Sequence, residues 1–132
     1  MQSTLKLNQI HHVSIICSDI ERSKKFYTDI LGLHIMQEIY RSDKDSYKLD
    51  FSLNGHFILE MFTFPNSPKR TTQPEACGLR HLAFEVSDIE LAVSTLKESG
   101  VKTEEIKLDE HTGKHYVFFK DPDELPIELY QK

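Results

Sequence analysis

The 132-residue chain has no tryptophan, only two cysteines and no long apolar run. The spacing of Cys17 and Cys77 fits neither a disulfide framework nor a zinc knuckle, so we expect two structural thiols in a reducing compartment. No apolar run approaches the length of a membrane span, and the opening residues MQSTLKLNQI lack the parts of a secretory signal. These absences favour a cytoplasmic protein with no membrane partner.

Positive charge is scarce as well. Sixteen basic residues stand against 21 acidic ones, for a formal net charge of −5, and no run of Lys or Arg exceeds two residues. Nucleic-acid-binding proteins depend on clustered basic side chains, so we expect no nucleic-acid partner. With 39% hydrophobic and 28% charged residues, the composition is typical of a globular protein, and the length predicts a single domain over residues 1–132.

An internal repeat is the most informative feature of the sequence. The tetrapeptide SDIE occurs at 18–21 and again at 87–90, and a histidine precedes each copy by six positions: His12 and His81. The residues between alternate apolar and polar, as a strand of period two requires, and each histidine shares the less apolar face of its predicted strand. The repetition predicts that the chain is built from two related modules.

Each SDIE tetrapeptide is expected to begin a helix. A serine N-cap followed three positions later by glutamate forms a capping box, and an apolar stripe follows each copy. Gly32 and Gly100 mark the expected helix ends. The two stripes are Ile20, Phe26, Tyr27, Ile30 and Leu31, then Ile89, Ala92, Val93 and Leu96.

Three strands are predicted after each helix. In the first half, a strand over 34–41 precedes a hairpin whose turn is Asn54-Gly55; in the second, a strand over 102–108 precedes a hairpin whose turn is Asp121-Pro122-Asp123. The predicted fold class is α+β: two tandem βαβββ modules, 9–64 and 79–131, with a proline-containing linker over 65–78.

The duplication also pairs two glutamates in the final strands of the hairpins, Glu60 and Glu128. Together with His12 and His81 they would supply two nitrogen and two oxygen donors to one divalent ion such as Zn, Ni, Co, Fe or Mn. The lack of thiolate donors argues against a closed structural zinc site, and four protein ligands leave places for water or a bidentate substrate. The sequence therefore predicts a catalytic metal centre.

The other five histidines are assigned structural roles. His11 competes with its neighbour His12, but it shares a face with Val13 and Ile15 and is matched by Arg80 in the second half. His56 has the strand parity of Glu60 and could line the pocket. The remaining three have no partner at a repeat-related position: His34, His111 and His115.

The chain resembles the vicinal oxygen chelate superfamily, and within it the glyoxalase I-like (lactoylglutathione lyase-like) proteins. The similar stretches are HHVSIICSDIERSKKFYTDILGL, GLRHLAFEVSDIE and FFKDPDELPIELY, within a resemblance that spans about residues 9 to 130. The resemblance implies curved mixed sheets that surround a metal-binding cleft. It further implies four metal ligands, His12, Glu60, His81 and Glu128, around nickel, cobalt or zinc. It also implies isomerisation of a hemithioacetal through a metal-stabilised enediolate, with Glu128 as the favoured base and Glu60 as its symmetry mate.

The chain departs from the family pattern at three positions. Family members that use glutathione usually present an arginine where this chain has Ile16 and an asparagine where it has Phe64. Glutathione adducts are therefore predicted to be poor substrates. Glu124 stands in place of the usual glycine in the turn before the last strand, so a different turn is possible there.

Three other functions, and two possible locations of the metal sites, stay open at this point. A thiol transferase of the fosfomycin-resistance type or an extradiol dioxygenase would use only one of the two glutamates, and a metal-free drug-binding module would need none of the four ligands. Each module leaves one sheet face open and in need of a partner module, so we expect a homodimer with two equivalent sites. These sites can lie within one chain or between two.

Overall fold

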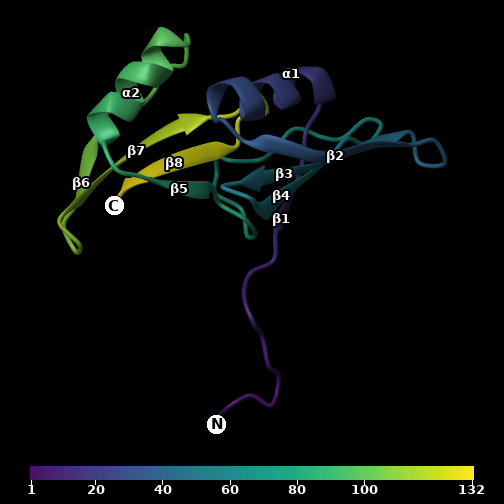
Figure 1. Ribbon diagram of the computed structural model, residues 1–132, viewed down its shortest axis with the longest axis horizontal. Helices are drawn as coiled ribbons and strands as arrows, with labels where there is room; N and C mark the ends of the chain where they lie inside the picture. Colours follow the sequence, from purple (N-terminus) through teal and green to yellow (C-terminus); the bar gives the residue numbers. More distant parts are fainter.

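Each half of the chain folds into a four-stranded mixed sheet with helical structure on one face, in a computed structural model that describes residues 1–132 (Figure 1). The first half contains β1 (Val13–Ile16), α1 (Ile20–Lys25), the π-helical turn η1 (Phe26–Ile30), β2 (His34–Arg41), β3 (Ser46–Leu53) and β4 (His56–Phe62). The second half contains β5 (Leu82–Val86), α2 (Ile89–Glu98), β6 (Lys107–Asp109), β7 (Lys114–Lys120) and β8 (Pro126–Gln131). The predicted pair of βαβββ modules is confirmed.

The two sheets share one topology. Sheet A has the order β1-β4-β3-β2 and sheet B the order β5-β8-β7-β6. In each, the first strand runs parallel to the last, whereas the other neighbours are antiparallel. Both helices lie on the same side of the sheets in Figure 1, so both sheets expose their opposite faces, which we call the open faces.

The hydrophobic core lies between the helices and the covered faces of the sheets. Strand residues of alternating parity supply most of it, because only every second side chain of a strand points toward the helices. The fully buried members include Leu49, Phe51, Leu59 and Met61 of sheet A and Val117, Phe119 and Ile127 of sheet B. The side chains of the alternate positions point to the open faces, where the predicted site residues lie.

The helix starts differ from the predicted capping boxes. The N-cap residues are Asp19 and Asp88, whose carboxylates accept hydrogen bonds from the backbone N–H groups of Arg22 and Leu91. A carboxylate at the N-cap satisfies the same free N–H groups that the serine hydroxyl was expected to satisfy. The helices therefore begin one residue later than predicted, and Ser18 is free to bond elsewhere.

The strand predicted over 102–108 is also wrong in its extent. Only Lys107–Asp109 forms β6, paired with β7. The Val101 N–H still bonds to the Leu96 carbonyl as part of the helix end, and a single backbone bond, from Glu104 N–H to the Phe118 carbonyl, ties the next residues to β7. The chain thus leaves α2 and approaches the sheet without a ladder of bonds.

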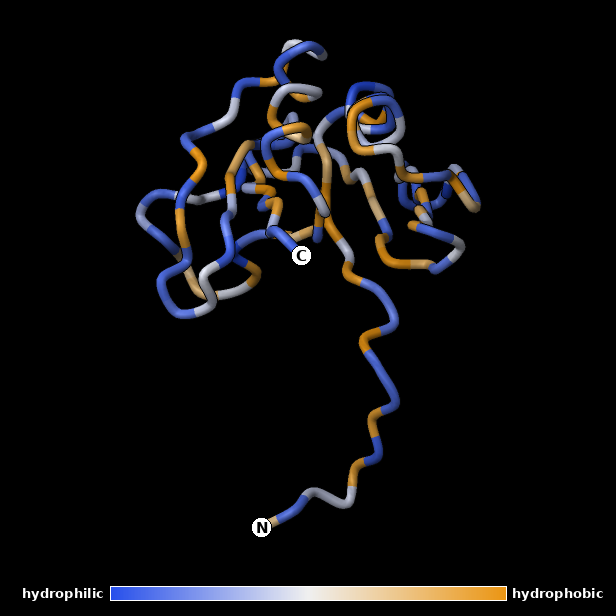
Figure 2. Tube along the Cα trace, turned by 60° about the vertical axis from the view of Figure 1, so that its left-hand side comes forward, coloured by the Kyte–Doolittle hydropathy of each residue, from blue (hydrophilic) through white to orange (hydrophobic).

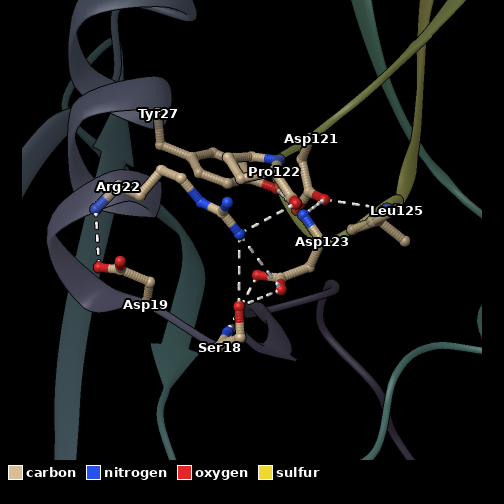
Figure 3. A network of polar contacts seen from close by, with 8 residues as sticks. All are labelled: Ser18, Asp19, Arg22, Tyr27, Asp121, Pro122, Asp123 and Leu125. Carbon is tan, nitrogen blue, oxygen red and sulfur yellow. Dashed lines mark hydrogen bonds and ion pairs between the residues drawn. The ribbon is translucent and has the colours of Figure 1, made fainter.

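A polar network joins the two halves on the helix side (Figure 3). Tyr27 is fully buried and its hydroxyl donates to Asp121 Oδ2 at 2.8 Å. Asp121 Oδ1 accepts the N–H groups of Asp123 and Leu125, and Asp123 accepts both the N–H and the hydroxyl of Ser18. Burial raises the pKa of both the Asp121 carboxyl group and the Tyr27 hydroxyl group. Tyr27 therefore stays protonated and can donate. The turn before β8 is thereby fixed to the helix of the first module.

Residues 1–10 form no helix or strand and extend away from the body on the side of the open faces (Figures 1 and 2). Apolar and polar residues alternate along this arm in Figure 2. Leu5, Leu7 and Ile10 are 69%, 82% and 87% exposed. The single chain therefore offers nothing to cover these side chains.

Candidate functional site

The first candidate pair lies on the open face of sheet A. Glu60 in β4 is in register with Ser14 of β1 and Asp50 of β3, so all three side chains share one face. His12 precedes β1 with the parity of Ser14, and its Nε2 lies 3.8 Å from Glu60 Oε1. The His12 ring stacks on Phe57, with centroids 4.9 Å apart. The histidine and glutamate predicted for this half therefore lie side by side.

The second candidate pair repeats this arrangement on sheet B. Ala83 of β5 is in register with Glu128 of β8, and His81 stands two residues before Ala83. Its Nε2 lies 3.3 Å from Glu128 Oε1, and its ring meets Phe118 edge-on at 5.0 Å. The side chains are 25% and 14% exposed, so the pair is partly desolvated yet reachable from the open face.

A neighbouring side chain contacts each histidine at Nδ1. His11 Nδ1 lies 2.8 Å from His12 Nδ1, so one ring must donate and the other accept. If His12 donates, its Nε2 carries a free lone pair that faces Glu60. Arg80 Nη1 lies 3.0 Å from His81 Nδ1 and can only donate, which puts the His81 proton on Nε2. The sequence assigned His11 a structural role and did not predict its contact with the His12 ring.

The two glutamates differ in their surroundings. Lys48 Nζ bonds to both carboxylate oxygens of Asp50 at 2.9 Å and lies 3.5 Å from Glu60 Oε2. The hydrogen bond that Lys48 donates to Asp50 is the main cause of the raised Lys48 pKa, so this lysine stays charged. Glu128 has no lysine or arginine within ion-pair distance, and its one such contact is His81. The register that aligns Lys48 and Asp50 with Glu60 cannot be read from sequence spacing.

A broad cleft of about 1150 Å³ lies over the open face of sheet B. Its floor includes His81 and Glu128, together with Tyr116, Phe118 and Tyr130. The segment predicted as a linker forms one wall, because residues 69–73 and Glu75 line the cleft. Arg70 holds this wall in place by donating from Nη2 to the carbonyls of Leu79 and Arg80. The linker therefore shapes the cleft as well as joining the modules.

The two pairs do not come together within one chain. No three His, Cys, Asp or Glu side chains of the chain form a group that could hold a metal ion. Each module instead presents one histidine and one glutamate on its open face.

The remaining histidines and the cysteines divide as follows. His56 is exposed in the strand next to the Asn54-Gly55 turn, and a register shift after Phe51 separates it from the row of Glu60. His111 lines the rim of the cleft. Cys17 is buried, and burial raises its pKa to about 11, as expected of a structural thiol. Cys77 is exposed, so the structural role predicted for both thiols fits only Cys17.

Comparison with known proteins identifies the class. Residues 9–129 match the family described as the glyoxalase, bleomycin resistance protein and dioxygenase superfamily, and the chain belongs to this family. Proteins of the family often bind a divalent metal and commonly act as dimers on small-molecule substrates.

Two similar proteins cover almost the whole chain. The uncharacterized protein YwkD of Bacillus subtilis is 55% identical over 126 residues, which are 96% of this chain and 98% of that protein. The crystal structure of a glyoxalase family protein from Enterococcus faecalis is 44% identical, with a TM-score of 0.87 over 93% of this chain and 97% of that one.

More distant relatives carry enzyme names. A lactoylglutathione lyase of Schizosaccharomyces pombe is 31% identical over 149 residues, which are 96% of this chain but 47% of that protein. The chain thus spans about half the length of that enzyme. A mitochondrial methylmalonyl-CoA epimerase of Mus musculus is 28% identical over 134 residues, 96% of this chain and 74% of that protein.

None of the helices is long and apolar enough to cross a membrane.

Proposed function

We propose that the protein is a divalent-metal-dependent lyase or isomerase of the glyoxalase I type, acting on a hemithioacetal or a similar substrate with neighbouring oxygens. The observation that carries the proposal is the matched placement of two histidine–glutamate pairs. His12 with Glu60 and His81 with Glu128 occupy equivalent places in the two modules, each on an open face.

The donor set suits a divalent ion. Two donors bound to one ion at about 2.1 Å each lie about 3 Å apart, and the two pairs have separations of 3.8 and 3.3 Å. His12 can offer Nε2 without change if His11 accepts its Nδ1 proton. For His81 to offer Nε2, its Nδ1 has to give up the bond from Arg80, whose side chain is 61% exposed and also pairs with Glu75. We propose nickel, cobalt or zinc, with iron or manganese as further candidates.

In a dimer, His12 and Glu60 of one subunit would face His81 and Glu128 of the other, giving two equivalent sites. When bound, the metal would act as a Lewis acid toward the substrate oxygens. The protein would contribute the proton transfer. Glu128 is the better candidate for the base, because Lys48 lies beside Oε2 of Glu60 whereas no cationic side chain of Lys or Arg restrains Glu128.

Replacing Glu128 tests this assignment. Glu128→Ala should lose bound metal and activity together, and Glu128→Gln should retain more metal but lose turnover by about 10² to 10⁴-fold, the usual contribution of a general base. Glu60→Gln should weaken metal binding with a smaller loss of turnover per bound metal. The measurements are elemental analysis of the purified protein and thioester formation from methylglyoxal with several low-molecular-weight thiols.

Glu105→Ala provides a matched control, since Glu105 is exposed in the loop before β6 and touches neither pair. It should leave metal content and turnover unchanged. Full metal content with normal turnover in Glu128→Ala would contradict the proposal. In the same assay the glutathione adduct should be a poor substrate, because Ile16 and Phe64 offer no hydrogen bond to a tripeptide.

A further inference from the structure

One cationic side chain on the open face of sheet A has no acidic partner. Arg41 is the last residue of β2 and is in register with Ser46, the first residue of β3. Ser46 has the parity of Lys48 and Asp50. Arg41 therefore lies on the same face as Glu60. It belongs to none of the ion pairs of the molecule, unlike Arg22 and Arg80.

The guanidinium of Arg41 is held in a defined position. Its Cζ lies 4.6 Å from the ring centre of Phe62 and 5.6 Å from that of Phe64, and these two rings stack on each other. Nη2 donates to Ser46 Oγ at 2.8 Å. Nε is buried and has no hydrogen-bond partner. Nη1 donates no hydrogen bond within the chain, so the fixed guanidinium keeps a free donor with which to bind an anion.

The position of this cation relates it to the proposed reaction centre. Phe62 lies two residues beyond Glu60 in β4, a step of about 6.6 Å along a strand. Ile16 is in register with Phe62. The uncharged Ile16 thus lies next to Phe62, and the Arg41 guanidinium packs on the Phe62 ring.

We infer that Arg41 is a substrate-recognition residue that binds a carboxylate, and that the natural substrate carries one such group a short chain away from its reacting carbons. The inference rests on the proposed function for the identity of the reaction centre. The flat guanidinium can donate two parallel hydrogen bonds to a carboxylate, while Phe62 and Phe64 pack against its face and against the apolar part of the substrate. A thiol with one carboxylate fits this arrangement better than the longer glutathione.

N-acetylcysteine and its carboxamide form a matched pair of probes, because they differ at one group only, a charged carboxylate in the first and a neutral amide of similar size in the second. Binding of their unreactive S-methyl derivatives to the metal-loaded protein is measured by calorimetry, and turnover is measured with their methylglyoxal adducts. The wild-type protein should prefer the carboxylate in both measurements. Arg41→Gln should weaken carboxylate binding about 10- to 100-fold and change carboxamide binding by less than about threefold.

Two further variants complete the experiment. Lys44→Gln removes the same charge from the exposed turn between β2 and β3 and should change neither ligand's affinity. Arg41→Lys keeps the charge but not the paired donors and should lie between the wild-type protein and Arg41→Gln. Equal weakening of both ligands in Arg41→Gln would assign Arg41 a purely structural role and overturn the inference.

The binding measurement does not depend on turnover, so the inference and the proposed function can fail separately. Absence of thioester formation with either adduct, alongside a carboxylate preference that Arg41→Gln abolishes, would reject the reaction and support the recognition site. A wild-type protein that binds the two S-methyl derivatives equally would overturn the recognition site, even if Arg41→Gln does not fold.

Discussion

Glu124 holds a backbone conformation that favours glycine. Its φ is +68°, in the left-handed region, in the turn between β7 and β8. The usual family turn has a glycine at this position, and the sequence left open a different turn. The structure shows that glutamate adopts the left-handed conformation here, where its N–H bonds to the Asp121 carbonyl. A side chain in that region costs free energy because its Cβ approaches the following carbonyl.

We therefore expect Glu124→Gly to raise the free energy of unfolding by about 0.5 to 1 kcal/mol, after the greater freedom of glycine in the unfolded chain is subtracted. Chemical denaturation measures the change. Glu124→Ala is the control, because it removes the exposed ion pair with Lys120 but keeps the Cβ. This ion pair is worth little at the surface. Equal stability of the two variants would contradict the explanation.

At the scale of elements, the contact between η1 and the turn before β8 depends on Tyr27. Its hydroxyl donates to a buried carboxylate, so removal leaves Asp121 Oδ2 without that donor. Tyr27→Phe should lower the free energy of unfolding by about 1 to 3 kcal/mol, the cost of an unsatisfied buried polar group. The same chemical change at the exposed Tyr40, whose hydroxyl bonds to Asp45, should cost far less. Urea unfolding of both variants compares them, and a loss at Tyr27 no larger than that at Tyr40 would refute the role of the buried contact.

Local sequence patterns predicted some of the elements correctly. The strand over 34–41 and the Asn54-Gly55 turn are present as predicted, with φ values of +51° and +82° at the two turn residues. These features depend on local backbone preferences. The short β6 and the aspartate N-caps depend on which acceptors lie nearby in three dimensions, so local patterns misplaced them.

At the scale of the whole molecule, the proposed dimer would bring the open face of a module in one subunit against that of a module in the other. A shared site predicts complementation between His12→Ala and Glu128→Ala subunits. If each site takes one module from each subunit, a mixed dimer contains one doubly damaged site and one intact site. Random exchange of subunits should then restore about a quarter of wild-type activity. Thioester formation by the co-refolded mixture gives the measurement, and each variant refolded alone is the control. No recovery in the mixture would contradict a site shared between two subunits.

Residue patterns alone predicted the duplicated fold and the pairing of one histidine with one glutamate in each half. They could do so because strand alternation, turn residues and an internal repeat are local and periodic properties. The folded chain was needed to show that its two pairs stay apart, that residues 69–73 and Glu75 wall the cleft, and that Lys48 and Arg41 share a face with Glu60. These relations depend on strand register and on the packing of one module against the other, and neither is encoded in the spacing of residues along the chain.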